Sequence, residues 1–387
     1  MNLNNISLIK HNGSEIDLMK WNGHILYRRL PLYVPQEFRG TDVVEVKTMV
    51  NKTHDNLDYM FSGCNKLESV NTTDWDTSNV TSMYMMFNYC KALRSLNLSK
   101  WDVSNVTDMD AMFWYSDLIS IDTSNWNTKS VENMHYMFAN CDELTEVIGI
   151  QNWNVSNVTN MAYMFYSSDG LTELDLSDWK TGNVVHMNNM FNECGFLTTL
   201  DVSNWDVGNV TNMSSMFYDC QSLKSIEGIQ NWNVGNAEHM SSMFRSCYKL
   251  TSLDLSNWDT KNVKDVSHMF NYCKALRSLN LSNWDVYNVT NFKSMFYNCT
   301  QLQTLDLSNW NINTLGIANN MGSTFTNCYV LKELRLDNCN KDTVRSIIDY
   351  GGLPTGLVGG EKRKIYCKEE CVFESTLPDD WMFVIVD

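Results

Sequence analysis

One motif recurs through most of this chain and limits what the chain can fold into. Its cleanest copy, LDVSNWDVGNVTNMSSMFYDC, covers residues 200–220, and successive copies follow at intervals of 25 to 27 residues. A repeat of this length is typical of a solenoid, in which each unit buries its apolar face against its neighbours. The copies are marked by Trp75, Trp101, Trp126, Trp153, Trp179, Trp205, Trp232, Trp258, Trp284 and Trp310.

Two apolar patterns alternate within each repeat. The segment before the tryptophan, as in CTQLQTLDLSNW, spaces its leucines L-x-x-L-x-L, which ends in the period of two expected of a strand. In the segment after it, Val210, Met213, Met216 and Phe217 have the spacing of one face of a short helix. We therefore expect an α/β repeat solenoid of about 11 coils with about 26 residues each. Every coil should hold a parallel strand and a short helical segment, with the methionine columns in the core.

The chain divides into three predicted parts. Residues 1–50 contain two Asn-Gly pairs between short apolar runs and predict a β-meander, which is either a cap or an attachment module. Residues 51–340 form the solenoid. Residues 341–387 predict a C-terminal α/β cap, with a helix after Asn340 or Asp342 and two strands around a Pro-Asp turn.

Two of the repeats carry one extra residue, in EVIGIQNW and SIEGIQNW. The insertions place a glycine, Gly149 or Gly228, at the end of the expected strand. A glycine at an insertion in a strand predicts a local bulge.

The cysteines suggest a disulfide framework until the repeats are aligned. Two repeats have Ser116 or Ser168 in the cysteine column, and side chains stacked in one direction have poor disulfide geometry. A small buried residue at a tight corner explains the column better. The cysteines of this column are Cys64, Cys90, Cys141, Cys194, Cys220, Cys247, Cys273, Cys299 and Cys328.

Charge argues against two classes of partner. The net charge is -16, and the basic residues form no large block, which disfavours nucleic acid and anionic membrane surfaces. The first residues lack the basic and apolar regions of a signal peptide, and no apolar run is long enough for a membrane helix. We expect no membrane insertion.

Motifs for catalysis or cofactor binding are absent from the sequence. There is no G-x-S-x-G, H-E-x-x-H or phosphate-binding loop, and of the seven histidines only His186 and His239 share a repeat column. Cys367, Cys371 and Cys339 lack the second pair of ligands that a zinc site needs. We predict a protein that is not an enzyme and has no cofactor or metal site.

Two sets of surface residues are candidates for binding. Aspartates recur between the last two leucines of the strand, where a cation or basic partner would relieve their repulsion; a solvated polar face is the simpler interpretation. Aromatic residues follow the Met-Phe pair in several repeats and are typical of binding surfaces. The candidates are Asp122, Asp175, Asp201, Asp254 and Asp306, and Trp114, Tyr115, Tyr166, Tyr218 and Tyr297.

The repeat W-D-x-S-N-V-T-x-M-x-x-M-F-x-x-C-x-x-L-x-x-L-x-L-S resembles that of the BspA-like leucine-rich repeat surface proteins, of the DUF285 or mycoplasma-lipoprotein type. The resemblance covers roughly residues 55–340 and implies a leucine-rich repeat solenoid, displayed outside the cell, that binds a protein or glycan on a cell surface. The segment 1–50 also resembles modules of phage fibre proteins. An alternative hypothesis is therefore a virion component that attaches to other virion proteins through residues 1–50.

Overall fold

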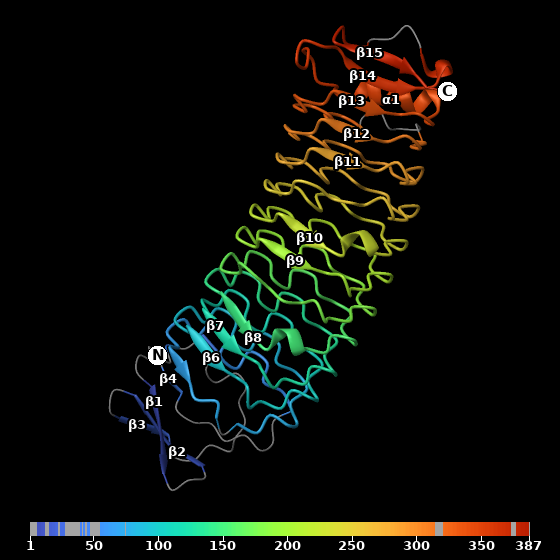
Figure 1. Ribbon diagram of the computed structural model, residues 1–387. Helices are drawn as coiled ribbons and strands as arrows, with labels where there is room; N and C mark the ends of the chain where they lie inside the picture. The colour runs from blue at the N-terminus through green and yellow to red at the C-terminus, as the bar shows by residue number, and fades with distance from the viewer. Residues whose placement is uncertain are drawn as a thin grey trace. The chain divides into compact units, whose positions relative to one another are not determined.

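The computed structural model of this protein divides into two compact units, Met1–Val184 and Val185–Asp387. Each unit is a stack of similar coils, coloured blue to green in the first and green to red in the second (Figure 1). The residues that the structure describes are 6–11, 15–21, 24–27, 39–40, 42, 45–46, 55–73, 75–313, 320–372 and 377–386.

The first unit begins with a small antiparallel sheet and continues with single short strands that pair in parallel. The sheet has the order β1-β2-β3, as the predicted meander requires, whereas both Asn-Gly turns lie outside the described residues. The later strands pair β4 with β5 and then β6 with β7 and β8. The strands are β1 (Ile6–His11), β2 (Glu15–Trp21), β3 (His24–Tyr27), β4 (Glu45–Val46), β5 (Ser69–Val70), β6 (Ser95–Asn97), β7 (Ser120–Asp122) and β8 (Glu146–Ile148).

The second unit follows the same plan and ends in the cap. Its sheets have the orders β10-β9 and β11-β12-β13-β14-β15, and all pairs are parallel. The strands are β9 (Thr199–Asp201), β10 (Ser225–Glu227), β11 (Ser278–Asn280), β12 (Thr304–Asp306), β13 (Glu333–Arg335), β14 (Arg363–Cys367) and β15 (Trp381–Ile385).

The leucine-spaced segments form the strands, as predicted. In β6, β7 and β8 the central residues Leu96, Ile121 and Val147 are in register and buried, while the flanking residues are more exposed. This alternation follows from the period of two along a strand. Two described coils, with the same pattern at residues 171–176 and 250–255, contain no assigned strand.

The prediction of a short helix in every coil is wrong, because the Met-Phe segments are consecutive turns. Ser215 and Asp219 have φ values of 55° and 57° at the third position of their turns, where a type II turn requires a left-handed residue. The amides of Ser215, Phe217 and Asp219 donate to carbonyls of the next coil at 2.8–2.9 Å, and the amides between them donate within the turns. In an α-helix all of these amides would donate to carbonyls of the same segment. The apolar spacing of three and four residues therefore reflects consecutive turns here and not a helix.

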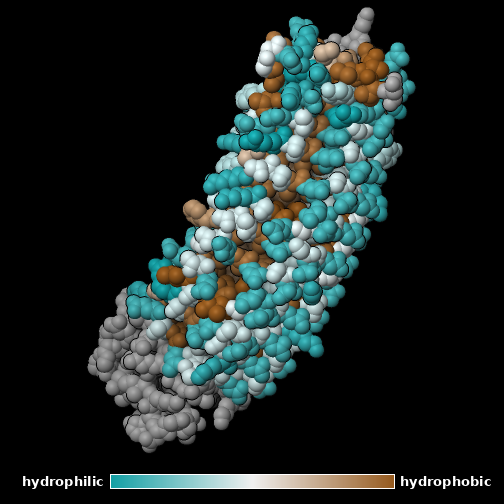
Figure 2. Space-filling model, in the orientation of Figure 1, coloured by the Kyte–Doolittle hydropathy of each residue, from teal (hydrophilic) through white to brown (hydrophobic). Residues whose placement is uncertain are grey.

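Stacked aromatic and sulfur side chains fill the interior of each unit, as predicted for the repeated columns. Phe217 and Phe244 stack with centroids 5.7 Å apart, and Trp232 and Trp258 stack at 6.3 Å. Methionines of the repeats, such as Met213, are fully buried. Burial of each such side chain contributes about 1.5–3 kcal/mol to stability. Polar side chains, teal in Figure 2, cover most of the visible face of each unit.

All twelve cysteines are free and buried, so the predicted corner role is confirmed. Cys141 Sγ donates to the Phe113 carbonyl of the preceding coil at 3.1 Å, and Ser116 Oγ donates to the Phe87 carbonyl at 2.5 Å. A hydroxyl can replace the thiol because it makes the same hydrogen bond. Burial raises the pKa of the Cys141 thiol to about 12.

The glycine insertions form short 3-10 turns in place of the predicted bulge. η1 (Ile150–Asn152) and η2 (Ile229–Asn231) follow Gly149 and Gly228, which have φ values of 90° and 84°. A Cβ on Gly149 would lie 2.4 Å from the Ser124 Cα. Only glycine fits because the preceding coil's backbone is so close.

The C-terminal cap contains the predicted helix, α1 (Lys341–Tyr350), and the Asn340 side chain caps it by accepting the Thr343 amide at 2.8 Å. A short 3-10 turn, η4 (Glu369–Cys371), follows β14. The expected strands β14 and β15 pair in parallel, and the Pro-Asp pair lies in the turn before β15, so the two strands do not form a hairpin. They extend the sheet beyond β13.

Candidate functional site

The aspartate column has a structural role in the turn after each strand. The Asp254 carboxylate accepts the Ser256 amide and hydroxyl at 3.1 and 2.7 Å, and these bonds lower its pKa. Asp201 likewise accepts the Ser203 amide at 2.9 Å. These are Asx turns, in which the side chain replaces a backbone acceptor. Asp122, Asp175 and Asp306 make the same turns with Ser124, Ser177 and Ser308.

The aspartates do not stack on one another where the strands are paired. Asp122 lies opposite Asn97 and Ile148, and Asp306 lies opposite Asn280 and Arg335. The repulsive ladder that would attract a cation is therefore not formed in these strands. In the described part of the chain, no group of three or more His, Cys, Asp or Glu side chains has a metal-binding arrangement.

The sequence-predicted aromatic residues are half-buried, and they separate into two groups. Trp114, Tyr115 and Tyr166 belong to the first unit, where they contact other aromatic rings. Tyr218 and Tyr297 belong to the second unit. The Arg245 guanidinium lies 5.3 Å from the Tyr218 ring centroid, and Tyr297 contacts Tyr272. Only the first group is part of a larger cluster.

This cluster is a continuous series of aromatic rings on the Met-Phe side of the first unit, which we call the aromatic strip. Tyr136 stacks on Tyr163 with centroids 4.6 Å apart, and Tyr136 also contacts Trp114 at 5.7 Å. All of these rings except Tyr166 pack on a ring of an adjacent coil, and such pairs contribute about 0.5–1.5 kcal/mol beyond burial. The strip consists of Tyr89, Trp114, Tyr115, His135, Tyr136, Tyr163 and Tyr166.

A second aromatic pair lies in earlier coils of the same columns. Tyr59 and Tyr84 meet edge to face at 5.0 Å. Burial, the hydrogen bond with Tyr59 and the nearby Asp110 carboxylate together raise the pKa of Tyr84 to about 12. Asp110 also raises the pKa of Tyr136, after burial and the contact with Tyr163. Asp110 therefore lies near both the Tyr59–Tyr84 pair and the aromatic strip.

Three carboxylates accompany these rings. Asp58 accepts the Ser82 hydroxyl at 2.5 Å and the Tyr84 amide at 2.9 Å, and Asp110 lies 3.3 Å from His135 Nδ1. Burial and the negative charges of Asp110 and Asp58 raise the pKa of Asp108. We call Asp58, Asp108 and Asp110 the carboxylate group. Half-buried rings and crowded carboxylates therefore lie side by side on this surface.

Sequence reasoning missed most of this surface. Tyr59, Tyr84, Tyr136 and the carboxylate group lie in the variable columns around and between the repeated methionines, and none of them belongs to a recognisable motif. The signal was present in the sequence: these columns hold most of their aromatic and acidic residues in the early repeats and mostly Asn, Ser or His in the later ones. Only the stacking of coils places them together.

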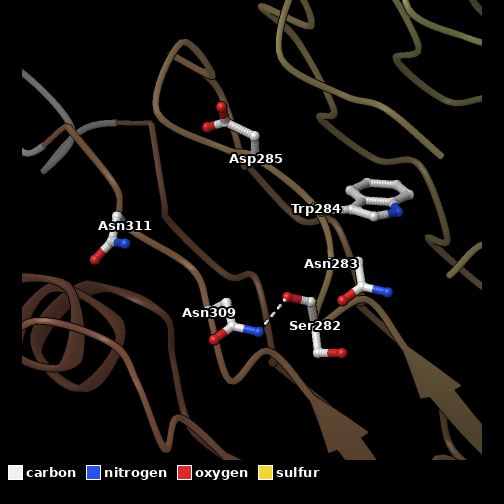
Figure 3. A pocket seen from close by; sticks show the side chains of 6 residues that line it. All are labelled: Ser282, Asn283, Trp284, Asp285, Asn309 and Asn311. Atoms are coloured by element: carbon white, nitrogen blue, oxygen red, sulfur yellow. Dashed lines mark hydrogen bonds between the residues drawn. The ribbon is translucent and has the colours of Figure 1, made fainter. Parts of the chain in front are cut away.

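The second unit contains a shallow pocket of about 380 Å³ lined by Ser282, Asn283, Trp284, Asp285, Asn309 and Asn311 (Figure 3). The Asn309 side-chain amide donates a hydrogen bond to the Ser282 carbonyl at 3.0 Å. The side-chain oxygens of Asn309 and Asn311 accept hydrogen bonds from asparagine side chains of the following coil. These amides already hold adjacent coils together. The aromatic strip therefore remains the stronger candidate.

Among the described residues, none of the helices reaches the length and apolarity that a membrane crossing requires. The family model described as "Mycoplasma protein of unknown function, DUF285" matches residues 55–149, 145–227 and 224–338. No curated protein matches the chain.

Several solved leucine-rich repeat structures are similar to the chain. One from Bacteroides ovatus is 15% identical, with 98% of each chain covered and a TM-score of 0.45. One from Eubacterium ventriosum is 16% identical, with 75% of this chain and 78% of the other covered and a TM-score of 0.34. A leucine-rich cell surface protein from Faecalibacterium prausnitzii is 15% identical, with coverage of 76% and 81% and a TM-score of 0.27.

Proposed function

Because the chain belongs to the DUF285 family of BspA-like leucine-rich repeat proteins, we propose that it is a non-enzymatic recognition protein whose aromatic strip contacts a protein or glycan outside the cell. The observation that carries this proposal is the aromatic strip itself. Its rings occupy positions that the framework leaves free, since the same columns accept serine and asparagine elsewhere in the chain.

The physical argument depends on half-burial. A ring held between neighbours loses little conformational freedom on binding and still offers a face to a partner. Tyr89, at the edge of the strip, is 40% exposed, and the other rings of the strip are half-buried. These rings can therefore bury further area at small entropic cost.

The test uses arrays of glycans and of extracellular proteins probed with the purified chain. Tyr136→Ser removes the central ring of the strip, and serine is compatible with this column because Ser215 and Ser242 occupy it in the second unit. Tyr297→Ser is the matched control outside the strip. We expect Tyr136→Ser to reduce the array signal at least several-fold and Tyr297→Ser to leave it unchanged. Equal signals from all three proteins would refute the proposal.

The alternative of a virion component finds no support in the comparisons. It depends on residues 1–50, of which the structure describes only short stretches. Mass spectrometry of purified phage particles and of washed envelopes from the source culture would decide this question.

A further inference from the structure

The chain places its own cations on the aromatic rings of the first unit. The Arg39 guanidinium lies 4.4 Å from the Tyr59 ring centroid, and the Lys91 ammonium lies 5.4 Å from the Tyr115 centroid. Both distances are within the range of a cation–π contact. These contacts show that rings of this surface accept guanidinium and ammonium groups.

The charge beside the rings has the complementary sign. Asp108 and Asp110 lie in one coil and Asp58 lies two coils earlier; burial and the negative charges of Asp110 and Asp58 raise the pKa of Asp108. Among the described residues, the ion pair made by this group is the one between Asp110 and His135. A cation brought by a partner would relieve this crowding, whereas a neutral glycan would leave it in place.

We infer that the Tyr59–Tyr84 pair, Tyr136 and the carboxylate group together bind a segment of a partner protein that presents arginine or lysine side chains. This inference rests on the proposed function and names its partner class. The cation packs on a tyrosine ring, and the neighbouring carboxylates balance its charge. Because half-buried carboxylates are screened less by salt than exposed ones, the pairing keeps part of its strength at physiological ionic strength.

The spacing of the rings suits an extended partner. Tyr59 and Tyr136 are three coils apart, which corresponds to roughly 14 Å at the spacing of parallel chains. Residues four apart in an extended segment are separated by about 13 Å. An extended peptide with arginines at this interval reaches both rings, taking the place of Arg39 at Tyr59. A peptide in which arginine alternates with serine contains this interval.

The experiment measures binding of that labelled arginine-serine peptide by fluorescence anisotropy. The control peptide replaces each arginine by citrulline, which keeps the shape and removes the charge. Two variants test the surface: Tyr84→Ser, whose column holds Ser214 and Ser241 in the second unit, and Asp110→Asn, whose column holds Asn188. Tyr218→Ser is the control variant, because that ring belongs to the second unit. Circular dichroism and the urea midpoint establish that each variant is folded.

We expect the arginine peptide to bind more tightly than the citrulline peptide. Tyr84→Ser and Asp110→Asn should each raise its Kd by about 3- to 30-fold, and Tyr218→Ser should change it less than about 2-fold. Equal binding of the two peptides, or equal Kd values for all variants, would overturn the inference. The isosteric Asp110→Asn keeps the test valid even where loss of a tyrosine ring destabilises the fold.

The array experiment separates this inference from the proposed function. If a glycan signal is lost in Tyr136→Ser while the arginine peptide does not bind, the recognition function stands and the cationic partner is excluded. If neither the array signals nor peptide binding respond to these variants, both proposals fail.

Discussion

The same three columns of the repeat carry different residues in the two units of the molecule. In the first unit the corresponding positions of successive coils are Asn56, Asp58 and Tyr59; Ser82, Tyr84 and Met85; Asp108, Asp110 and Ala111; Asn133, His135 and Tyr136; and Asn160, Ala162 and Tyr163. In the second unit the corresponding positions of successive coils are His186, Asn188 and Asn189; Asn212, Ser214 and Ser215; His239, Ser241 and Ser242; Asp265, Ser267 and His268; and Asn291, Lys293 and Ser294.

The framework around these columns hardly changes between the units. Parallel bridges join Ser82 to Asp108 in the first unit and Asn212 to His239 in the second. The flanking methionines and phenylalanines are buried in both. The comparison therefore separates two kinds of position. One kind is fixed by packing and hydrogen bonds, and the other is open to selection for binding.

Cations of the chain lie over aromatic rings in both units. The Lys274 ammonium lies 4.7 Å from the Tyr248 centroid and 5.4 Å from that of Tyr272, and Arg245 lies over Tyr218. In the first unit Arg39 and Lys91 likewise lie over Tyr59 and Tyr115, whereas no cation of the described residues lies over Tyr84 or Tyr136. Tyr84 and Tyr136 are therefore the rings that the inferred cationic partner would contact without displacing a cation of the chain.

The largest predicted effect tests whether a Cβ at the glycine insertion destabilises both units to the same extent. Gly149→Ala and Gly228→Ala would place a Cβ 2.4 and 2.2 Å from a backbone Cα of the preceding coil, at a positive φ. We expect each to destabilise its unit by at least about 3 kcal/mol, because the backbone must move. The measurement is the urea midpoint. Gly208→Ala is the control, since its Cβ would meet a side-chain oxygen at 3.1 Å, and we expect about 1 kcal/mol or less. A small effect at only one insertion would show that the two frameworks differ.

Much of the framework was predictable from the repeat period. A column of tryptophan, methionine, phenylalanine or cysteine at fixed spacing must be interior in a stacked chain, and the structure confirms this. The turns were not predictable, because their left-handed positions are occupied by residues such as Met85, Tyr136 and Glu193, where glycine would have been the recognisable signal. The hydrogen bonds that backbone amides donate to carbonyls of the next coil stabilise these conformations. These bonds do not depend on residue type, so the sequence does not reveal them.

The candidate site shows where reading one repeat at a time fails. The Asp-x-Ser pairs, such as Asp254 and Ser256, have the spacing of an Asx turn, and this local signal explains the aspartates that we had considered for binding. Tyr136 and Tyr163 are separated by a whole repeat, and they form a cluster only through stacking. Alignment of the repeats by their variable columns, in place of their fixed ones, would have found this cluster.

The next effect concerns the cysteine column. Cys141→Ser should change stability by less than about 1 kcal/mol, because Ser116 and Ser168 already make the equivalent bond in neighbouring coils. Cys141→Ala should cost about 1–2 kcal/mol, since the bond to the Phe113 carbonyl and the packing of the sulfur are both lost. Urea denaturation measures both. The pair Cys220→Ser and Cys220→Ala repeats the test in the second unit, and a reversed order there would contradict the common framework.

A transplant of aromatic residues tests the freedom of the variable columns directly. Ser215 and Ser242 lie in the column of Tyr136 and Tyr163, with φ values of 55° and 58° against 52° and 60°. We expect the double variant Ser215→Tyr, Ser242→Tyr to fold, with a favourable coupling of about 0.5–1 kcal/mol between the new rings in a double-mutant cycle. No coupling, or loss of the folded state, would show that the strip needs features that the second unit lacks.

The smallest effect concerns the backbone of the turns. Ala111 has a φ of 53°, a conformation that costs an alanine about 1–2 kcal/mol and glycine almost nothing. Glycine also loses about 0.5–1 kcal/mol more chain entropy on folding, so Ala111→Gly should stabilise the chain by roughly 0.5 kcal/mol. Ala162→Gly is the control: Ala162 is also buried, but its φ is not positive, and we expect a loss of about 0.5–1 kcal/mol. The opposite signs, measured by urea denaturation, are the diagnostic result. Ser215→Gly should share the sign of Ala111→Gly, because the left-handed turn belongs to the framework common to both units.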